Sequence, residues 1–433
     1  MLHLIKSLSW LLLVILVAAG CEPAPTAAPV LPATASHTLS PTSLPATPTL
    51  EPSPLPTQAP VSIPEATATT LPGPERLPAG QMVTITAINM IDASSGWASG
   101  GLSGESQHIL RTRDGGLTWQ DVTPPQPLPE KAEILIATAH YQDAETAWAF
   151  FTLEDGRPLQ PAIVWRTQAG GATWQASQQL DLRGLEWQFS VSDIQFAGPQ
   201  HGWLMAHVGV GMNHDYIMLF HSQDSGESWQ RLIDPYNDGG IQACYKPGMT
   251  FSDAQQGWLP VNCNGVMPGA LLYHTADGGA TWEMVYLPSP ADQPGLFENY
   301  AVACSVDSVA FFSTQMGYAA VTCANYDTDP LTYLYYLYST QDGGATWTEQ
   351  PYPGGKPTFL NPQTGWTQNQ DIYQTSDGGA TWAKVKAVAW QGEFDFVSNS
   401  LVWAVAQSGE QMALVRSEDG GLLWSELEPV ISP

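Results

Sequence analysis

From about Gln81 to Val430 the chain alternates apolar and polar residues with a period of two. The segment Val83–Ala87, with the sequence Val-Thr-Ile-Thr-Ala, is typical of a strand that buries one face. Few windows show the period of an amphipathic helix, so the pattern predicts an all-β domain. In the first repeat the predicted strands are Val83–Met90, a strand beginning at Gly96, His108–Thr112 and Leu117–Val122.

A nine-residue segment, for example Ser339–Trp347, occurs in seven copies, and we call it the box. Its Asp-Gly-Gly core allows the positive φ values of a tight hairpin turn, and its Asp and Thr side chains can bond to the turn's backbone. We expect each box to join the third and fourth strands of a repeat. Ala169 stands at the Asp position of the second copy; the other aspartates are Asp114, Asp224, Asp277, Asp342, Asp377 and Asp419. The box tryptophans are Trp119, Trp174, Trp229, Trp282, Trp347, Trp382 and Trp424.

A second aromatic series lies between the boxes, at the predicted start of each second strand. Its members are Trp97, Trp148, Trp203, Trp258, Tyr318, Trp366 and Trp403. Large side chains at fixed repeat positions indicate a core between repeats rather than a ligand site. Both series give seven units of about 51 residues, the size of a four-stranded propeller blade. The sequence therefore predicts a seven-bladed β-propeller at residues 81–430.

The box resembles the Asp-box, or BNR, repeat of β-propellers, Ser/Thr-x-Asp-x-Gly-x-Thr-Trp. Together with the preceding Phe-x(5)-Gly-Trp pattern, it resembles the photosystem II stability/assembly factor family. That resemblance implies a seven-bladed propeller that binds a protein partner. The family's binding is associated with a basic surface, whereas this chain has a net charge of −27, so the resemblance implies a binding or scaffolding role without a photosynthetic one.

The residues before the propeller predict export. Residues 1–20 combine Lys6 with the apolar run Leu11–Ala19, which is typical of a signal peptide and too short for a membrane span. Val17–Cys21 resembles a bacterial lipobox, which implies that Cys21 is the lipid-attachment residue and that the protein is extracytoplasmic and anchored to the cell membrane by lipid alone. An ordinary signal peptide and an uncut anchor remain alternatives. Residues 21–80, rich in Pro, Thr and Ser, predict a disordered stalk.

Four further cysteines form two pairs with equal spacing. Cys244 and Cys263 are 19 residues apart, as are Cys304 and Cys323, and both pairs occupy the same positions in their repeats. Other repeats have apolar residues there, which indicates facing positions on the first two strands. In an exported chain we expect two disulfides within blades. Reduced thiols acting as metal ligands are the alternative.

Charge limits the partners. With 14 Lys and Arg residues against 41 Asp and Glu, nucleic acid is excluded as a natural partner. No cofactor is predicted. Asp327 and Asp329 are a weak calcium candidate, and His207, His214 and Asp215 form a weak candidate for zinc or copper, since a hairpin could bring them together. A solvated loop explains these three residues equally well.

The long connections predict where a partner binds. Turns after first strands should share one face with the boxes, so the other turns, which vary in length, share the opposite face. The candidate binding rim there comprises Tyr236, Asn237, Tyr286, Phe297, Tyr300, Tyr326 and Tyr333. The predicted partner is an envelope or membrane protein, or a glycan.

No catalytic residue is predicted. Sialidases also carry Asp boxes, but their activity needs three converging arginines. Arg111, Arg166 and Arg416 each precede a box, on the face opposite the rim. Arg157, Arg183 and Arg231 remain, and a hydrolase with paired carboxylates stays open as an alternative.

Overall fold

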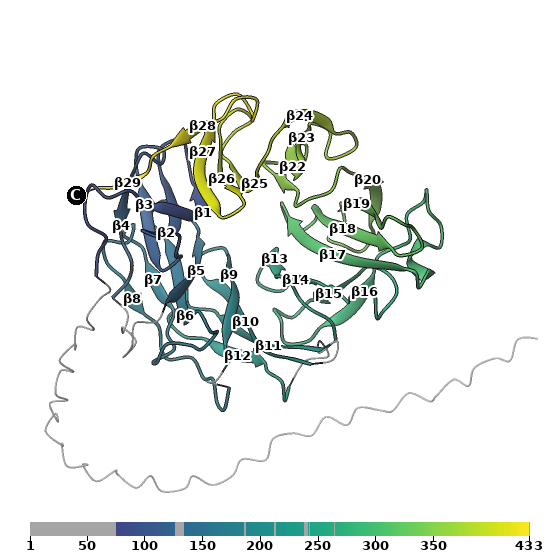
Figure 1. The fold of residues 1–433 in the computed structure, drawn as a ribbon. Coiled ribbons are helices and arrows are strands. Elements are labelled where there is room, and N and C mark those ends of the chain that lie inside the picture. Colours follow the sequence, from purple (N-terminus) through teal and green to yellow (C-terminus); the bar gives the residue numbers. More distant parts are fainter. Residues whose placement is uncertain are drawn as a thin grey trace, which may run out of the picture. The chain divides into compact units, whose positions relative to one another are not determined.

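The computed structural model describes residues 75–125, 134–185, 188–211, 214–237, 241, 243–263 and 265–432. All of them belong to one compact unit. They form seven antiparallel sheets, each built from four consecutive strands and arranged as the blades of a propeller (Figure 1). The predicted all-β, seven-bladed fold is therefore confirmed. The expected signal peptide, Cys21 and the stalk up to residue 74 lie outside the described residues.

The first strand of each blade lies toward the centre of the ring (Figure 1). Blades 1 and 2 are β1 (Thr84–Met90), β2 (Gly96–Gly101), β3 (His108–Thr112), β4 (Thr118–Asp121), and β5 (Leu135–Tyr141), β6 (Ala147–Leu153), β7 (Trp165–Thr167), β8 (Gln175–Ala176). Blades 3 and 4 are β9 (Ser190–Ala197), β10 (His201–Gly211), β11 (His214–Ser222), β12 (Gln230–Ile233), and β13 (Thr250–Phe251), β14 (Gly257–Pro260), β15 (Leu271–Thr275), β16 (Glu283–Tyr286). Blade 5 is β17 (Val302–Phe311), β18 (Gly317–Asn325), β19 (Thr332–Thr340) and β20 (Thr348–Pro351). Blades 6 and 7 are β21 (Thr358–Phe359), β22 (Gly365–Asn369), β23 (Asp371–Thr375), β24 (Ala383–Ala387), and β25 (Gln391–Phe396), β26 (Val402–Ser408), β27 (Gln411–Ser417), β28 (Ser425–Leu427). The short 3-10 helix η1 (Leu296–Glu298) precedes blade 5, and β29 (Val430–Ile431) follows blade 7.

The box is a hydrogen-bonded turn. In blade 6 the Asp377 carboxylate accepts bonds from the Thr381 hydroxyl at 2.6 Å and the Thr381 N–H at 2.9 Å, and Thr375 Oγ1 donates to it at 2.8 Å. These bonds favour the ionised form and lower the pKa of Asp377 to about 2. Blade 2 has Ala169 instead, and the side-chain bonds that its turn keeps are those to the Thr167 hydroxyl, at 3.0 and 3.1 Å.

Every box also bonds to the turn between the first and second strands of its own blade. In all seven blades the residue after the Asp position donates its N–H to a carbonyl of that turn, at 2.8–3.0 Å; in blade 5, Gly343 donates to Gln315. A Cβ at Gly343 would lie 2.8 Å from the Thr314 carbonyl oxygen, which explains the glycine. We call this side, with its boxes and first turns, the box face. The opposite side, with the remaining connections, is the loop face.

The second aromatic series joins neighbouring blades. Trp148 donates its indole N–H to the Ser225 carbonyl at 2.8 Å, and Trp203 donates to Gly278 at 2.8 Å. Both carbonyls belong to the residue after the box Asp of the next blade. Trp403 makes the equivalent bond to Gly115 at 3.0 Å, which links blade 7 to blade 1. Since these indoles are at most 2% exposed, the predicted core between blades is observed.

The two chain ends of the propeller meet on blade 1. Strand β29 adds to β4 in parallel, with Val430 opposite Thr118 and Ile431 opposite Trp119. Ile431 also donates its N–H to Gln81 and accepts from Gly80, both at 2.8 Å. Upstream, the Arg76 side chain and the Leu77 N–H bond to the Asp121 carboxylate at 3.0 Å. The folded part thus begins a few residues before the expected boundary at Gln81, because Asp121 holds this segment against β4.

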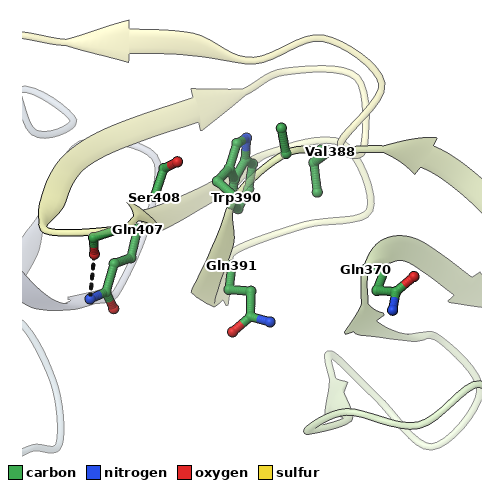
Figure 2. A pocket seen from close by; sticks show the side chains of 8 residues that line it. Gln370, Val388, Trp390, Gln391, Gln407 and Ser408 are labelled. Carbon is green, nitrogen blue, oxygen red and sulfur yellow. Dashed lines mark hydrogen bonds between the residues drawn. The ribbon is translucent and has the colours of Figure 1, made fainter.

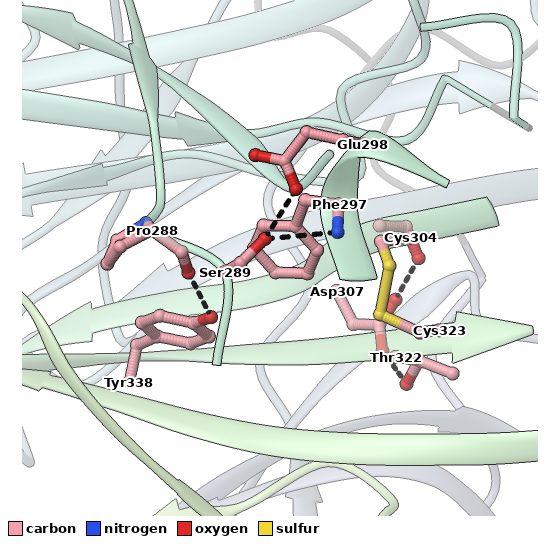
Figure 3. The surroundings of a disulfide bond; sticks show 10 residues. Pro288, Ser289, Phe297, Glu298, Cys304, Asp307, Thr322, Cys323 and Tyr338 are labelled. Carbon is pink, nitrogen blue, oxygen red and sulfur yellow. Dashed lines mark hydrogen bonds between the residues drawn. A yellow bond between two sulfur atoms is a disulfide. The ribbon is translucent and has the colours of Figure 1, made fainter. Parts of the chain in front are cut away.

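The predicted disulfides are present, within blades 4 and 5: Cys244–Cys263 and Cys304–Cys323. Cys304 on β17 lies directly opposite Cys323 on β18, and both are buried (Figure 3). Disulfides are typical of proteins in oxidising, extracytoplasmic compartments. Within the described part of the chain, no helix has the length and apolar character needed to cross a bilayer.

Replacing Cys304 and Cys323 by serine should lower the free energy of unfolding by about 3 kcal/mol, because the bridge closes a loop of roughly 20 residues in the unfolded chain. Urea denaturation of the oxidised protein measures this change. The matched Cys244→Ser/Cys263→Ser variant should lose a similar amount. The free thiols of the unreduced wild-type protein can be counted under conditions that prevent thiol–disulfide exchange. Four free thiols from these cysteines would contradict both pairings.

Candidate functional site

Acidic and amide side chains on the central strands bond to the next blade. The free edge of each first strand leaves N–H groups without a partner strand. Asp193 accepts from the Met249 N–H at 3.2 Å, and Gln195 accepts from the Phe251 N–H at 2.9 Å. Asp395 accepts from the Met90 N–H, again across a junction. These carboxylates are therefore structural acceptors that tie the centre of the ring together.

Burial raises the pKa of Asp193 to about 6, against the opposing effect of the Met249 hydrogen bond and the Lys356 charge. Burial likewise raises the pKa of Asp395 to about 6. Folding therefore favours the protonated acids, and the stability they contribute is present at pH 4 and falls as the pH rises to about 6.

We expect Asp395→Asn to remove much of this fall and to raise the melting temperature at pH 7.5 by about 2 °C, because asparagine still accepts the Met90 N–H without carrying a buried charge. Thermal unfolding between pH 4 and 8 measures the difference. Asp327→Asn removes a charge from an exposed loop and serves as the control. A variant less stable than wild type at pH 7.5, but not at pH 4, would show that the ionised carboxylate is favourable.

The arginines considered for a sialidase site do not converge. Arg157, Arg183 and Arg231 each pair with a carboxylate two or three residues away, at 2.6, 2.6 and 3.2 Å. The three arginines beside boxes lie between blades: Arg111 and Arg416 lie over the rings of Trp97 and Trp403, and Arg166 bonds to the Ser225 carbonyl. Each guanidinium is thus engaged locally.

Of the residues predicted as a zinc or copper site, the structure brings His207 and Asp215 together but not His214. His207 Nδ1 lies 2.8 Å from Asp215, whose other carboxylate oxygen accepts the Lys246 N–H at 3.0 Å. The hairpin pairs His214 with Gly211 and His207 with Ile217, so the two histidines do not face each other. Among the residues that the structure describes, no group of three His, Cys, Asp or Glu side chains could hold a metal, and this includes Asp327 and Asp329.

The predicted rim is largely exposed on the loop face. Exposed fractions are 87% for Tyr236, 81% for Tyr300, 66% for Tyr326, 55% for Tyr286 and 51% for Tyr333, and Asn237 is also exposed. Tyr245, at 45%, was missed because it lies next to Cys244 in a segment assigned to packing. These six tyrosines, on the connections and strand ends of blades 3 to 5, are called the tyrosine surface below.

Phe297 does not belong to this rim, so its prediction was wrong. It is 5% exposed, and its ring lies 6.4 Å from that of Tyr338. Helix η1 turns it inward: the Phe297 N–H donates to Ser289 Oγ at 3.1 Å, and Ser289 donates to Glu298 at 3.0 Å (Figure 3). The exposed neighbour is Tyr300.

A cavity of about 480 Å³ lies on the loop face between blades 6 and 7. Its lining is uncharged: Gln370, Val388, Ala389, Trp390, Gln391, Gln407, Ser408 and Gly409. Figure 2 shows Trp390 and Gln391 in the middle of this group, with Gln407 on one side and Gln370 on the other. Sequence reasoning favoured long loops and missed this cavity, whose walls come from short turns. No residue pattern marked it: Gln370 adopts a φ of 64° in its turn, which is rare for a non-glycine residue and is not evident from the residue type.

Comparison with known proteins finds similarity in fold to solved structures. No protein-family model and no curated protein match this chain. A puromycin-hydrolysing peptidase from Mycobacterium tuberculosis is similar over 82% of this chain and 57% of its own, with 9% identity and a TM-score of 0.51. The likeness shows the propeller fold alone. Two other solved structures are similar at lower TM-scores: YCF48 bound to D1 peptide (17% identity, 82% of this chain, 99% of that chain, 0.48) and a PL25 ulvan lyase (10%, 81%, 86%, 0.43).

Proposed function

We propose that the protein is an extracytoplasmic binding propeller, without catalytic activity, that engages a protein partner through the tyrosine surface. The observation that carries this proposal is the exposure of six tyrosines, by 45–87%, on one face of three consecutive blades. Tyrosine offers a large apolar ring with a polar hydroxyl, and it is enriched where proteins bind one another. The face also exposes Val210, Val266 and Leu331.

The form of this surface favours a protein over a small ligand. The six tyrosines lie on the connections and strand ends of three blades, and none of them lines the cavities of about 480, 330 and 270 Å³. A broad aromatic surface suits a partner that covers many residues at once. The net charge of −27 favours a partner with a basic contact region.

The location follows from the same proposal. The disulfides support an extracytoplasmic site, and we propose that a lipid on Cys21 tethers the propeller through residues 21–80 to the membrane. The partner is then an envelope or membrane protein within reach of the tether. A Cys21→Ser variant that remains membrane-bound after salt washing would contradict the lipid tether without affecting the binding surface.

Site-specific cross-linking tests the binding face. A photo-reactive phenylalanine analogue at Tyr300 should capture a discrete envelope protein on intact membranes, whereas the same analogue at Leu423, on the box face and 70% exposed, should not. Capture of the same protein from Leu423 alone would place the partner on the wrong face for this proposal.

Glycan binding is the second candidate, and the cavity between blades 6 and 7 favours it. Amide side chains beside an indole suit the hydroxyl groups and apolar faces of a neutral sugar, and the absence of charged lining disfavours anionic glycans. A glycan array compared between wild type and Gln391→Ala tests this candidate. Equal glycan binding by wild type and Gln391→Ala would show that glycans do not bind in this cavity.

A further inference from the structure

One junction between blades lacks the tryptophan that fills the others. Blade 5 has Tyr318 at the position occupied by tryptophan in the other six repeats. At three junctions the indole N–H bonds to the residue after the next box Asp, as with Trp203 and Gly278. The equivalent carbonyl beyond Tyr318 belongs to Gly378, the residue after Asp377.

Tyr318 does not reach that carbonyl. Its hydroxyl donates instead to the Pro357 carbonyl at 3.0 Å, near the start of β21. Its ring is tilted by 46° against Phe359 at 4.8 Å, whereas Trp203 stacks on the equivalent Phe251 at 3.7 Å and 5°. The tyrosine therefore occupies only part of the space that an indole fills elsewhere.

The Gly378 carbonyl is left with a weak substitute. Gln350 Nε2 lies 3.4 Å from it, which is long for an N–H···O bond. Gln350 is a flexible side chain on β20, so a better donor can displace it. At three other junctions, those of Trp148, Trp203 and Trp403, an indole N–H satisfies the equivalent carbonyl.

A cavity of about 270 Å³ opens at this junction on the box face. Rings and apolar groups form one part of its lining, and amides form another: Phe312, Met316, Phe359, Gln341, Gln350 and Gln363. Tyr318, Gly378 and Asp377 also line it, so the charged group in its lining is a carboxylate. No lysine, arginine or histidine lines it, so an anionic ligand would find no partner charge.

We propose that this cavity binds an indole group, whose ring enters beside Tyr318 and Phe359 and whose N–H donates to the Gly378 carbonyl. The junctions of Trp148, Trp203 and Trp403 show that this protein's own geometry accepts such a ring against such a carbonyl. The indole comes either from a small molecule or from a tryptophan side chain of a partner. This site lies on the box face, so it does not depend on the tyrosine surface of the loop face.

Titration of the full chain with free indole tests the site, followed by calorimetry or ligand-observed NMR. We expect a dissociation constant on the order of 0.1–1 mM, as suits a ligand of so few atoms. N-methylindole keeps the ring and loses the donor, so it should bind roughly 3- to 10-fold more weakly. Equal affinity of the two probes would overturn the proposed bond to Gly378.

Two substitutions locate the binding. Tyr318→Trp restores the residue of the other repeats, so it should fill the cavity from within and abolish indole binding while the protein stays folded. Gln350→Ala removes the competing amide, and indole should bind roughly 3-fold more tightly. The proposal would be overturned if indole still bound to Tyr318→Trp and bound to Gln350→Ala with unchanged affinity. It would also be overturned if wild type showed no binding at about 10 mM indole, 10-fold above the expected range of dissociation constants.

Competition between indole-containing ligands for the site distinguishes a partner's tryptophan from a small molecule as the source of the indole. N-acetyl-tryptophanamide, which mimics a tryptophan within a chain, should compete better than free indole if the site receives a partner's side chain. Free indole or tryptophan should compete better if the site serves a small molecule. Loss of indole binding in Tyr318→Trp with unchanged cross-linking from Tyr300 would show that the two faces act separately.

Discussion

Replacing Trp403 by alanine is expected to lower the free energy of unfolding by about 3–5 kcal/mol, a large part of the stability of a typical domain. Trp403 is fully buried, lies under the Arg416 guanidinium and donates to the Gly115 carbonyl, so it packs the junction that closes the ring. The substitution leaves a cavity, and the Gly115 carbonyl loses its donor. Urea denaturation followed by near-ultraviolet circular dichroism measures the loss.

Two controls separate ring closure from general loss of apolar surface. Trp403→Phe keeps most of the ring and removes the N–H, so it should cost less than the alanine variant. Leu423→Ala removes a side chain that is 70% exposed and should change stability by less than about 0.5 kcal/mol. A loss below about 1 kcal/mol for Trp403→Ala would mean that the ring does not depend on this junction.

The repeat could be predicted because its information is local. A box places its turn residues, hydroxyl and carboxylate within nine positions, and Asp377 forms its bonds within four residues on either side. Cys304 and Cys323 could be paired because their spacing around Tyr318 fixes their register on two adjacent strands. Patterns of this kind do not depend on the rest of the chain.

Features that join distant segments could not be predicted. Strand β29 has two residues, and its pairing with β4 spans more than 300 positions without any pattern in sequence. The bond from Met90 to Asp395 crosses the same closure. Phe297 and Tyr300 belong to one loop, and only the turn of η1 decides that the first is buried and the second exposed.

The two faces of the ring therefore differ in what constrains them. On the box face, every blade repeats the same bond between box and first turn, so substitutions of the residues that make this bond act on stability. The loop face carries no such repeated bond in the described connections, and its residues are freer to vary with the partner. The junction at Tyr318 differs from the others on the box face because a tyrosine replaces the tryptophan, and the proposed indole site is the cavity at this junction.

The largest effect on function is expected from the tyrosine surface. Replacing Tyr300, Tyr326 and Tyr333 together by alanine should weaken binding of the envelope partner by at least about 30-fold, because truncation of a single interface hot spot costs about 2 kcal/mol or more. Since each side chain is 51–81% exposed, the melting temperature should change by less than about 2 °C. Recovery of the partner by cross-linking and the affinity of the purified pair measure the loss.

A triple variant of the box face provides the matched comparison. Leu117, Leu422 and Leu423 are 50%, 52% and 70% exposed, so replacing them by alanine removes a similar number of large exposed side chains from the opposite side. Binding should then stay within about 2-fold of wild type, because rim and non-contact positions carry little of the energy. If the leucine variant loses the partner and the tyrosine variant keeps it, the binding face has been assigned to the wrong side of the propeller. If both variants lose the partner and both melt early, the effect is on folding, and the tyrosines then have no separate role in recognition.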